Sequence, residues 1–346
     1  MLYLLTFILA VSLALYGVTL ARRAALRFNI VDRPDGQLKR QAAPVPYFGG
    51  LVVYLAFLVS LALTFEFRQD VLGLVLGGTL MVMLGLIDDF GVLTPGSKLI
   101  GQLIAVFVLI RSGIRIEIAA FPEWLDLALT VLWMIGVINA LNIIDVMDGL
   151  AGGVGVIACV WLFVVALFNQ DTVSAAMLAA LAGGLIGFLR YNVHPASIYL
   201  GDAGSLFVGL MLGALAMIGK YTAVNPLSVL TPVLILGVPV FDTFFVMYIR
   251  WRRGVPVFWG SPDHFALRLR HWRLTVPQVM LVSYGAALFL GGIGVLAMIV
   301  SHGVAAGLNV LAAILALVAA LLLKRVDMAR PAESPPRPAG TDARAP

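Results

Sequence analysis

Side chains suited to phosphate or metal chemistry gather in three short stretches of an otherwise apolar chain. They are Asp88 and Asp89 in GLIDDF, then Asn139, Asn142, Asp145 and Asp148 in NALNIIDVMDG, and Asp202 in YLGDAGSLFVG. A carboxylate at the centre of a membrane costs about 2.5–3.5 kcal/mol on insertion scales and less near the interface, and neighbouring acids also repel each other. A divalent cation removes both penalties. Because the chain has one cysteine and no histidine cluster, these oxygen ligands favour a hard ion such as Mg²⁺, with Mn²⁺ as an alternative.

Each stretch also has a structural interpretation. The pair Asp88 and Asp89 could simply be solvated acids at a helix end, and Asp202 could cap a helix. Positions 139, 142, 145 and 148 are three residues apart, so a helix would rotate them by only about 60° per step and keep them on one side. Such a stripe serves either hydrogen bonding between helices or ligand binding, and its two carboxylates favour ligand binding.

Two basic segments are further candidates for binding. The loop 32–50 carries Lys39 and Arg40 before a Gly-Gly entry into the next apolar run, and basic residues there also act as plain topology determinants. The segment 251–272 mixes cations with tryptophans and carries Asp263 and His264. A single His-Asp pair is more often structural than catalytic, and part of this segment could lie as an interfacial helix.

The composition places the chain in a membrane. Hydrophobic residues make up 61% of it and charged residues 12%, which is more apolar surface than a soluble domain of 346 residues could bury. The expected fold is an all-α polytopic bundle of about ten or eleven transmembrane helices. The expected spans are 2–21, 47–65, 71–87, 99–111, 124–141, 150–168, 173–190, 204–219, 227–249, 275–300 and 304–323.

Lys and Arg residues set the expected orientation. With the N-terminus outside and the C-terminus in the cytoplasm, nineteen of the 23 Lys and Arg residues fall on the cytoplasmic side, and so do all the acidic motifs. The net charge of +5 then reflects topology and not nucleic-acid binding. We expect one transferase-type domain over 1–325 and a disordered cytoplasmic tail over 326–346. Its active-site loops would be 22–46, 88–98, 139–149, 191–203 and 250–274.

The motifs together resemble a known family. GLIDDF, NALNIIDVMDGLAGG, YLGDAGSLFVG and the PVPYFGG loop, in this order and on one predicted side of the membrane, resemble the polyprenyl-phosphate N-acetylhexosamine-1-phosphate transferases. The resemblance implies an Mg²⁺-dependent transfer of a sugar 1-phosphate from a UDP-sugar to undecaprenyl phosphate, with release of UMP. It also implies a multi-pass enzyme of the bacterial inner membrane, often a homodimer, at the first membrane step of a cell-envelope polysaccharide such as lipopolysaccharide or the cell wall.

The resemblance also assigns roles to individual residues. Asp88 is similar to the family's base or nucleophile, Asp89 to the carboxylate near the metal, Asp202 to the Mg²⁺ ligand and Lys39 to the loop lysine. Residues that it implies for the nucleotide, diphosphate and sugar are Asn142, Asp145, Asp148, Asp263, His264 and Arg268.

The chain departs from the family pattern in the last of these loops. Where many relatives carry His-x-His-His after Pro-Asp, this chain has His264 followed by Phe265, Ala266 and Leu267, so the missing contacts would pass to His264, Arg268 or Arg270. The triple-histidine loop of the muramoyl-pentapeptide branch is also missing, which favours a UDP-N-acetylglucosamine-type donor.

A transporter of protons or cations is the alternative from another functional class, because acids within membrane spans are signals of function in either case. A transporter is expected to carry its acids near the middle of the membrane in paired half-repeats. The acids of this chain fall at the predicted inner ends of spans, and no internal repeat is evident.

Overall fold

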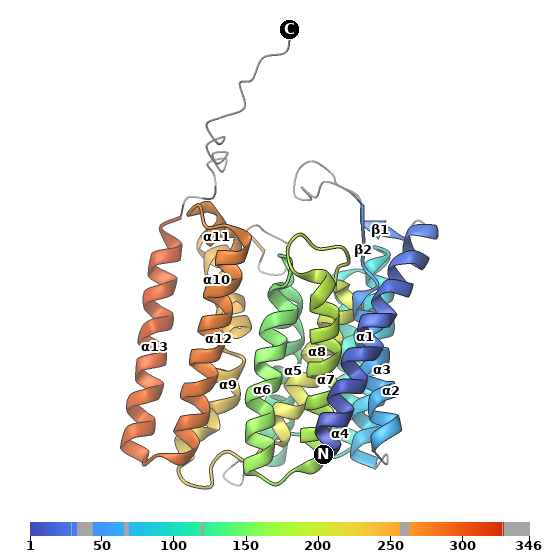
Figure 1. The fold of residues 1–346 in the computed structure, drawn as a ribbon. Helices are drawn as coiled ribbons and strands as arrows, with labels where there is room; N and C mark the ends of the chain where they lie inside the picture. Colours follow the sequence, from blue (N-terminus) through green and yellow to red (C-terminus); the bar gives the residue numbers. More distant parts are fainter. Residues whose placement is uncertain are drawn as a thin grey trace.

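In the computed structural model, the chain forms a bundle of long helices that alternate in direction (Figure 1). The structure describes residues 1–28, 30–32, 44–65, 69–118, 121–256, 263–326 and 328. The strands β1 and β2, Val31–Asp32 and Val45–Pro46, form one short antiparallel pair. The helices are α1 Leu2–Arg27, α2 Gly49–Thr64, α3 Gln69–Asp89, α4 Pro95–Arg111, α5 Glu123–Ile143, α6 Leu150–Phe168, α7 Thr172–Asn192, α8 Gly201–Ile218, η1 Pro226–Leu230, α9 Thr231–Ile235, α10 Gly237–Arg252, α11 Phe265–His271, α12 Val276–Ile299 and α13 His302–Lys324.

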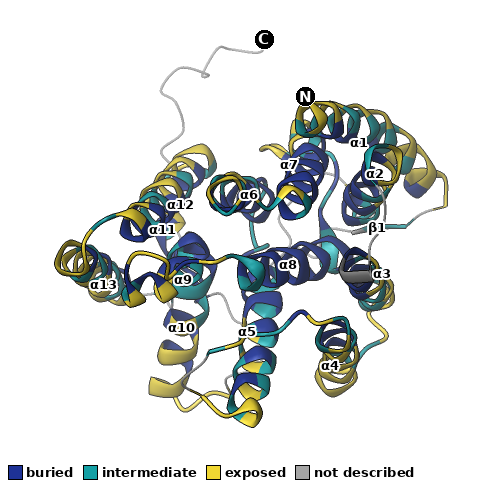
Figure 2. Cartoon of the chain, turned by 90° about the horizontal axis from the view of Figure 1, so that it is seen from below, coloured by how far each residue is buried: buried dark blue, intermediate teal, exposed yellow. Residues whose placement is uncertain are grey.

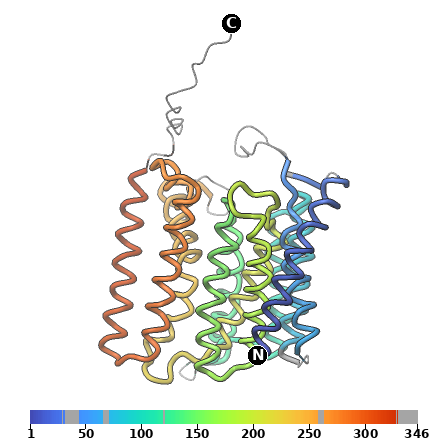
Figure 3. Tube along the Cα trace, in the orientation of Figure 1, coloured from blue at the N-terminus to red at the C-terminus, as the bar shows by residue number. Residues whose placement is uncertain are grey.

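The predicted all-helical membrane fold is confirmed. Eight of the described helices are long and apolar enough to cross a membrane, and a ninth crossing results if the bent pair 226–235 and α10 is one span. The helices α2 and α4, with 16 and 17 residues, are shorter. The start of α1 and the end of α13 lie at opposite ends of the bundle, and the tube view follows the chain from one to the other (Figure 3). Which compartment each end faces stays a prediction.

The predicted span 227–249 is a broken helix. The segment η1–α9 meets α10 at an angle of 79°. Pro239 lies in the first turn of α10, where it has no amide hydrogen for the carbonyl of Ile235 and its ring would clash with that carbonyl in a continuous helix. The hydropathy of this segment is that of a membrane span throughout, which is why composition alone predicts one element.

Helix α8 is the centre of the part of the bundle that carries the acidic motifs (Figure 2). Helices α2, α3 and α5 pack around it. Glycines permit the closest approaches, because a Cβ atom on Gly50 would overlap the backbone of Gly204 and one on Gly85 would overlap the backbone of Ala203. Small residues let membrane helices approach in this way. The first turn of α8 is therefore held against the last turns of α3.

Local signals fix where α4 begins. Thr94 and Ser97 form a capping box, in which the hydroxyl of each accepts the backbone N–H of the other, and Pro95 occupies the first helical position. Both features are strong signals for the N-terminus of a helix. The start at Pro95 places Lys98 in the first turn of α4, at the same end of the bundle as the end of α3.

The packing of α3 on α8 predicts a cost for any side chain at Gly85. We expect Gly85→Ala to lower the free energy of unfolding by about 1–3 kcal/mol, because its methyl group would overlap the Ala203 backbone. Gly136→Ala in α5 is the control, since a Cβ atom there has nothing within 4 Å and alanine favours the helix. Thermal unfolding of the detergent-solubilised protein measures both. Equal melting temperatures for the two variants would contradict this packing.

Candidate active site

A lysine lies between two carboxylates where α3, α4 and α8 meet. The Nζ atom of Lys98 is 2.6 Å from Oδ2 of Asp88 and 3.1 Å from Oδ2 of Asp202. It also donates to Oδ1 of Asn142, at the end of α5, over 3.2 Å. All three side chains of the ion pairs are partly buried, so the ammonium group compensates two carboxylates that solvent reaches poorly. Four helices contribute to this one cluster.

The role of Lys98 was not predicted from the sequence, where it counted only as a charge that sets topology. The signal was its place nine residues after Asp89, in the first turn of a helix whose start Thr94 and Pro95 mark. A helix that starts there turns back along α3, so its first turn must lie near the carboxylates at the end of α3.

The amide stripe of NALNIIDVMDG divides into two parts. Asn142 donates to Oδ1 of Asp202 and, over 2.9 Å, to Oγ of Ser205. Asn139 instead exchanges hydrogen bonds with Gln102 of α4, at 2.8 and 3.3 Å. Asn139 therefore makes a hydrogen bond between helices, which is the structural interpretation of the stripe. Asn142 instead orients a carboxylate of the cluster.

Asp89 caps the N-terminus of α8. Its Oδ1 accepts the backbone N–H of Asp202 at 2.8 Å, and its Oδ2 accepts that of Ala203 at 3.3 Å. These are amide hydrogens that a helix leaves without internal partners. Gly201, with φ of +71°, lies directly against this carboxylate, so a side chain there would be both strained and obstructed. The residue expected near a metal thus fixes the position of Asp202.

The end of the stripe is not helical, because α5 ends at Ile143 and Asp145 follows in the turn before α6. Burial raises the pKa of Asp145 to about 8, and the negative charges of Asp202, Asp89 and Asp148 contribute to this rise. The charges of carboxylates from all three motifs therefore act on Asp145.

Asp148 holds the loop that leads into α8. Its Oδ2 atom lies 2.7 Å from Nδ1 of His194 and accepts the backbone N–H of Ala196 at 3.1 Å. Next to it, the Gly149 N–H donates to Oδ1 of Asn192 over 2.9 Å. The predicted role of Asp148 in nucleotide binding stays a prediction, and these contacts give it a structural task as well.

The residues predicted on the last loop form a network with α10 and α13. Nδ1 of His264 is 2.9 Å from Oδ2 of Asp242, whose Oδ1 accepts the Phe265 N–H at 2.8 Å. The buried guanidinium group of Arg268 donates to Oδ1 of Asp263 at 2.7 Å and also to backbone carbonyls of residues 323 and 326. Arg268 is 1% exposed, so its guanidinium group is committed to the protein itself. Asp242, the partner of His264, was not among the residues expected from the sequence.

The remaining predicted residue, Lys39, lies outside the described residues, and its role stays a prediction. Within the described ranges, no group of three or more His, Cys, Asp or Glu residues is arranged to hold a metal ion. The carboxylates of Asp88 and Asp202 nevertheless lie within hydrogen-bonding reach of each other and converge on a cation. This donor set fits an ion that takes one or two carboxylates and completes its shell with water and phosphate oxygens, as Mg²⁺ does.

The part of the chain that contains the three acidic motifs is similar to known proteins. Residues 71–220 match the family model described as glycosyl transferase family 4. A putative glycosyltransferase of Streptomyces coelicolor is 34% identical over 302 residues, which are 85% of this chain and 68% of the relative. The phospho-N-acetylmuramoyl-pentapeptide-transferase of Halalkalibacterium halodurans is 33% identical over 298 residues, 78% of this chain and 88% of the relative. The chain belongs to glycosyl transferase family 4.

This family membership confirms the resemblance inferred from the motifs. A probable undecaprenyl-phosphate N-acetylglucosaminyl 1-phosphate transferase of Bacillus subtilis is 28% identical over 287 residues, 80% of each chain. As a member of the family, the chain is a membrane-embedded enzyme that transfers a phospho-sugar. The matched range 71–220 contains Asp88, Lys98, Asn142 and Asp202 of this chain, and it ends before His264.

The lysine at the centre of the cluster predicts a loss of activity on its removal. We expect Lys98→Gln to lower the transferase turnover about 100-fold, because the charge that holds two carboxylates together, and that would face phosphate oxygens, is gone. Turnover of the purified protein measures this effect. Lys220→Gln, which removes an exposed lysine at the far end of α8, is the matched control. Equal turnover of both variants would rule out a central role for Lys98.

The cap on α8 predicts different stabilities for two variants of Asp89. We expect Asp89→Ala to lower the free energy of unfolding by about 0.5–2 kcal/mol, because both amide hydrogens lose their acceptor. Asp89→Asn keeps one acceptor oxygen and should lose less. Thermal unfolding in detergent without divalent cations separates the two. Identical stability of both variants and the wild type would show that the carboxylate does not act as a cap.

Proposed function

We propose that this enzyme transfers an N-acetylhexosamine 1-phosphate, with N-acetylglucosamine as the sugar, from a UDP-sugar to undecaprenyl phosphate. The products are undecaprenyl diphosphate-sugar and UMP. The observation that carries the proposal is the cluster in which Lys98 joins Asp88, Asp202 and Asn142. The proposal is further supported by the relatives, which include decaprenyl-phosphate N-acetylglucosaminephosphotransferases in addition to the Bacillus subtilis protein.

The reaction needs charge neutralisation and alignment more than a special functional group. An oxygen of the lipid phosphate attacks the phosphorus that carries the sugar, the bond from this phosphorus to the bridging oxygen breaks, and UMP leaves with that oxygen. Lys98 stabilises the negative charge on the phosphate oxygens, and Asn142 keeps Asp202 oriented toward them. When Mg²⁺ is bound at Asp202, it supplies further positive charge to the diphosphate.

Asp88 serves either of two routes. In a single displacement, its carboxylate accepts the proton of the lipid phosphate or orients it. In a double displacement, its carboxylate attacks the sugar-bearing phosphorus first, UMP leaves, and the lipid phosphate then takes the phospho-sugar from the aspartyl group. The second route releases UMP before any acceptor is added, in an amount up to one equivalent of enzyme, and the first does not.

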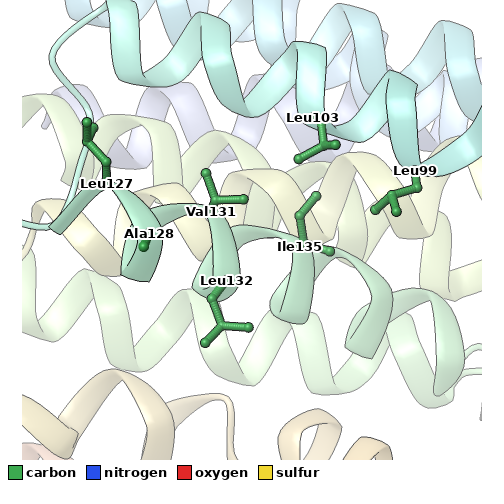
Figure 4. Close-up of a pocket in the computed structure, with 7 residues that line it drawn as sticks. All are labelled: Leu99, Leu103, Leu127, Ala128, Val131, Leu132 and Ile135. Carbon is green, nitrogen blue, oxygen red and sulfur yellow. The ribbon is translucent and has the colours of Figure 1, made fainter. Parts of the chain in front are cut away.

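An apolar groove between α4 and α5 suits the polyprenyl tail. Its volume is about 570 Å³, and apolar side chains make up its lining. Leu99 and Leu103 of α4 face Val131 and Ile135 of α5 across it (Figure 4). Leu99 directly follows Lys98 in the chain, so a lipid lying in the groove would have its phosphate at the ammonium group. Both substrates would then meet at the membrane interface.

We also propose that the cluster faces the cytoplasm of a bacterial cell. The basis is the orientation predicted from the sequence, in which nineteen of the 23 Lys and Arg residues fall on the same side as the acidic motifs. We propose that Lys39 also contacts the diphosphate, and that His264, at the N-terminus of α11, does so from the other part of the bundle.

Release of UMP tests the proposed reaction. We expect the purified protein to release UMP from UDP-N-acetylglucosamine and undecaprenyl phosphate only with Mg²⁺ or Mn²⁺, and Asp88→Asn to reduce this release at least about 1000-fold. Asp171→Asn is the control, because Asp171 caps α7 at the other end of the bundle and asparagine caps a helix equally well. Near wild-type release by a folded Asp88→Asn protein, or no release from any UDP-N-acetylhexosamine, would refute the proposal.

Filling the groove tests the tail site. We expect Ile135→Trp to raise the KM for undecaprenyl phosphate about tenfold while the KM for the UDP-sugar stays unchanged, because the indole occupies volume that the tail needs. Leu315→Trp on α13 is the control, since Leu315 is 41% exposed on another face of the bundle. An equal change in both KM values would instead indicate a distorted active site.

A further inference from the structure

Two cations meet at one hydroxyl group, on the side of the bundle opposite α3 and α4 (Figure 2). The Nζ atom of Lys324 lies 3.2 Å from the Tyr248 hydroxyl and 5.5 Å from the centre of the Tyr248 ring. The guanidinium group of Arg252 lies within hydrogen-bonding reach of the same hydroxyl. Among the residues that the structure describes, no ion pair joins either cation to a carboxylate.

This arrangement is that of an anion site. Two positive charges that share one hydroxyl group repel each other, and an anion between them turns the repulsion into attraction. Each cation in the last turn of its helix also offsets the helix dipole, but that effect acts on α10 and α13 separately and does not bring the two charges together. A phosphate group, with several acceptor oxygens, can bind both cations at once.

The position of Lys324 is fixed by the protein. Arg268, which is buried, donates to the carbonyl oxygen of Leu323 at 3.1 Å and to that of Val326 at 3.0 Å. These two carbonyl groups flank Lys324 in the chain. The same guanidinium group is held by Asp263, so the end of α13 is tied to α11 and cannot carry Lys324 away from α10.

The site also lies at the ends of two apolar helices, as expected for contact with lipid headgroups. Arg252 and Lys324 end α10 and α13, at the end of the bundle that carries α11 and the β1–β2 pair (Figure 1). Only 11% of the most apolar stretch of α13 is buried in the bundle, so most of this helix faces away from the other helices. Trp251, beside the site, is 72% exposed, and its ring lies 6.5 Å from that of Tyr248. Tryptophan and tyrosine with this exposure are typical of the membrane interface.

We propose that Tyr248, Arg252 and Lys324 bind the phosphate headgroup of an anionic phospholipid, in the leaflet next to the carboxylate cluster. The two cations attract the phosphate, the tyrosine ring and Trp251 contact the glycerol and upper acyl region, and the open side of α13 accommodates the chains. This site is separate from the substrates of the proposed transfer reaction and does not depend on them.

Retention of lipid by the intact protein tests the proposal. The detergent-purified full-length chain is titrated with phosphatidylglycerol or phosphatidylcholine, and bound lipid is counted by native mass spectrometry. We expect the wild type to prefer phosphatidylglycerol, and the double variant Arg252→Gln/Lys324→Gln to bind it at least about tenfold more weakly. Arg23→Gln, which removes an exposed cation near the same end of α1, should retain wild-type binding.

Two further arms separate the alternatives. Lys324→Arg keeps the positive charge. This single variant should retain wild-type lipid binding and the elution profile of the wild type. Millimolar inorganic phosphate, compared with chloride at equal ionic strength, should not displace the lipid. Equal phosphatidylglycerol binding by the wild type and the double variant, equal loss in Arg23→Gln, or displacement by free phosphate would each overturn the assignment to a lipid headgroup.

Discussion

Carboxylates at a membrane interface stay together only if something balances their charge, and among the residues that the structure describes the ammonium group of Lys98 does so in this cluster. Lys98 contacts Asp88 and Asp202, which come from helices far apart in the sequence, and Asn142 connects it to a third helix. The ion pairs and hydrogen bonds of this cluster therefore connect α3, α4, α5 and α8 to one another. A substrate diphosphate and a divalent cation would enter a site in which the opposite charges are already in place, and preorganisation of this kind provides much of the rate acceleration in many phosphoryl transfers.

Backbone contacts also hold the helices of this cluster together. Asp89 holds the first amide groups of α8, and the glycines of α2 and α3 let these helices approach that same turn. All the acids of the cluster consequently sit at one end of the bundle. This placement speaks against a transporter, whose coupling acids belong near the middle of the membrane. It is what an enzyme needs if one substrate is dissolved in water and the other is embedded in lipid.

The fold class and the members of the acidic cluster could be predicted from the sequence, because hydropathy marks helices and isolated acids in apolar runs are costly. The partners of those acids could not. Lys98 looks like any basic residue at a helix end until α4 is seen to return along α3. Asn139 bonds to Gln102 of α4 and Asn142 bonds to Asp202 of α8. The sequence does not show which neighbouring helix each amide faces. Likewise, Arg268 has the positive charge expected of a phosphate-binding residue. Only its contacts with the end of α13 show that its guanidinium group has a structural role.

The order of the partners along the chain also bears on how the protein is assembled. Lys98 follows Asp88 after a short turn, so the hairpin of α3 and α4 contains both partners of this ion pair before the later helices are synthesised. The backbone N–H groups that bond to Asp89 within the described residues belong to α8, which is synthesised more than a hundred residues later. The nascent chain thus carries one acid already paired and one still without its amide donors, and insertion of α8 is the step at which Asp89 meets those donors and Lys98 meets its second carboxylate.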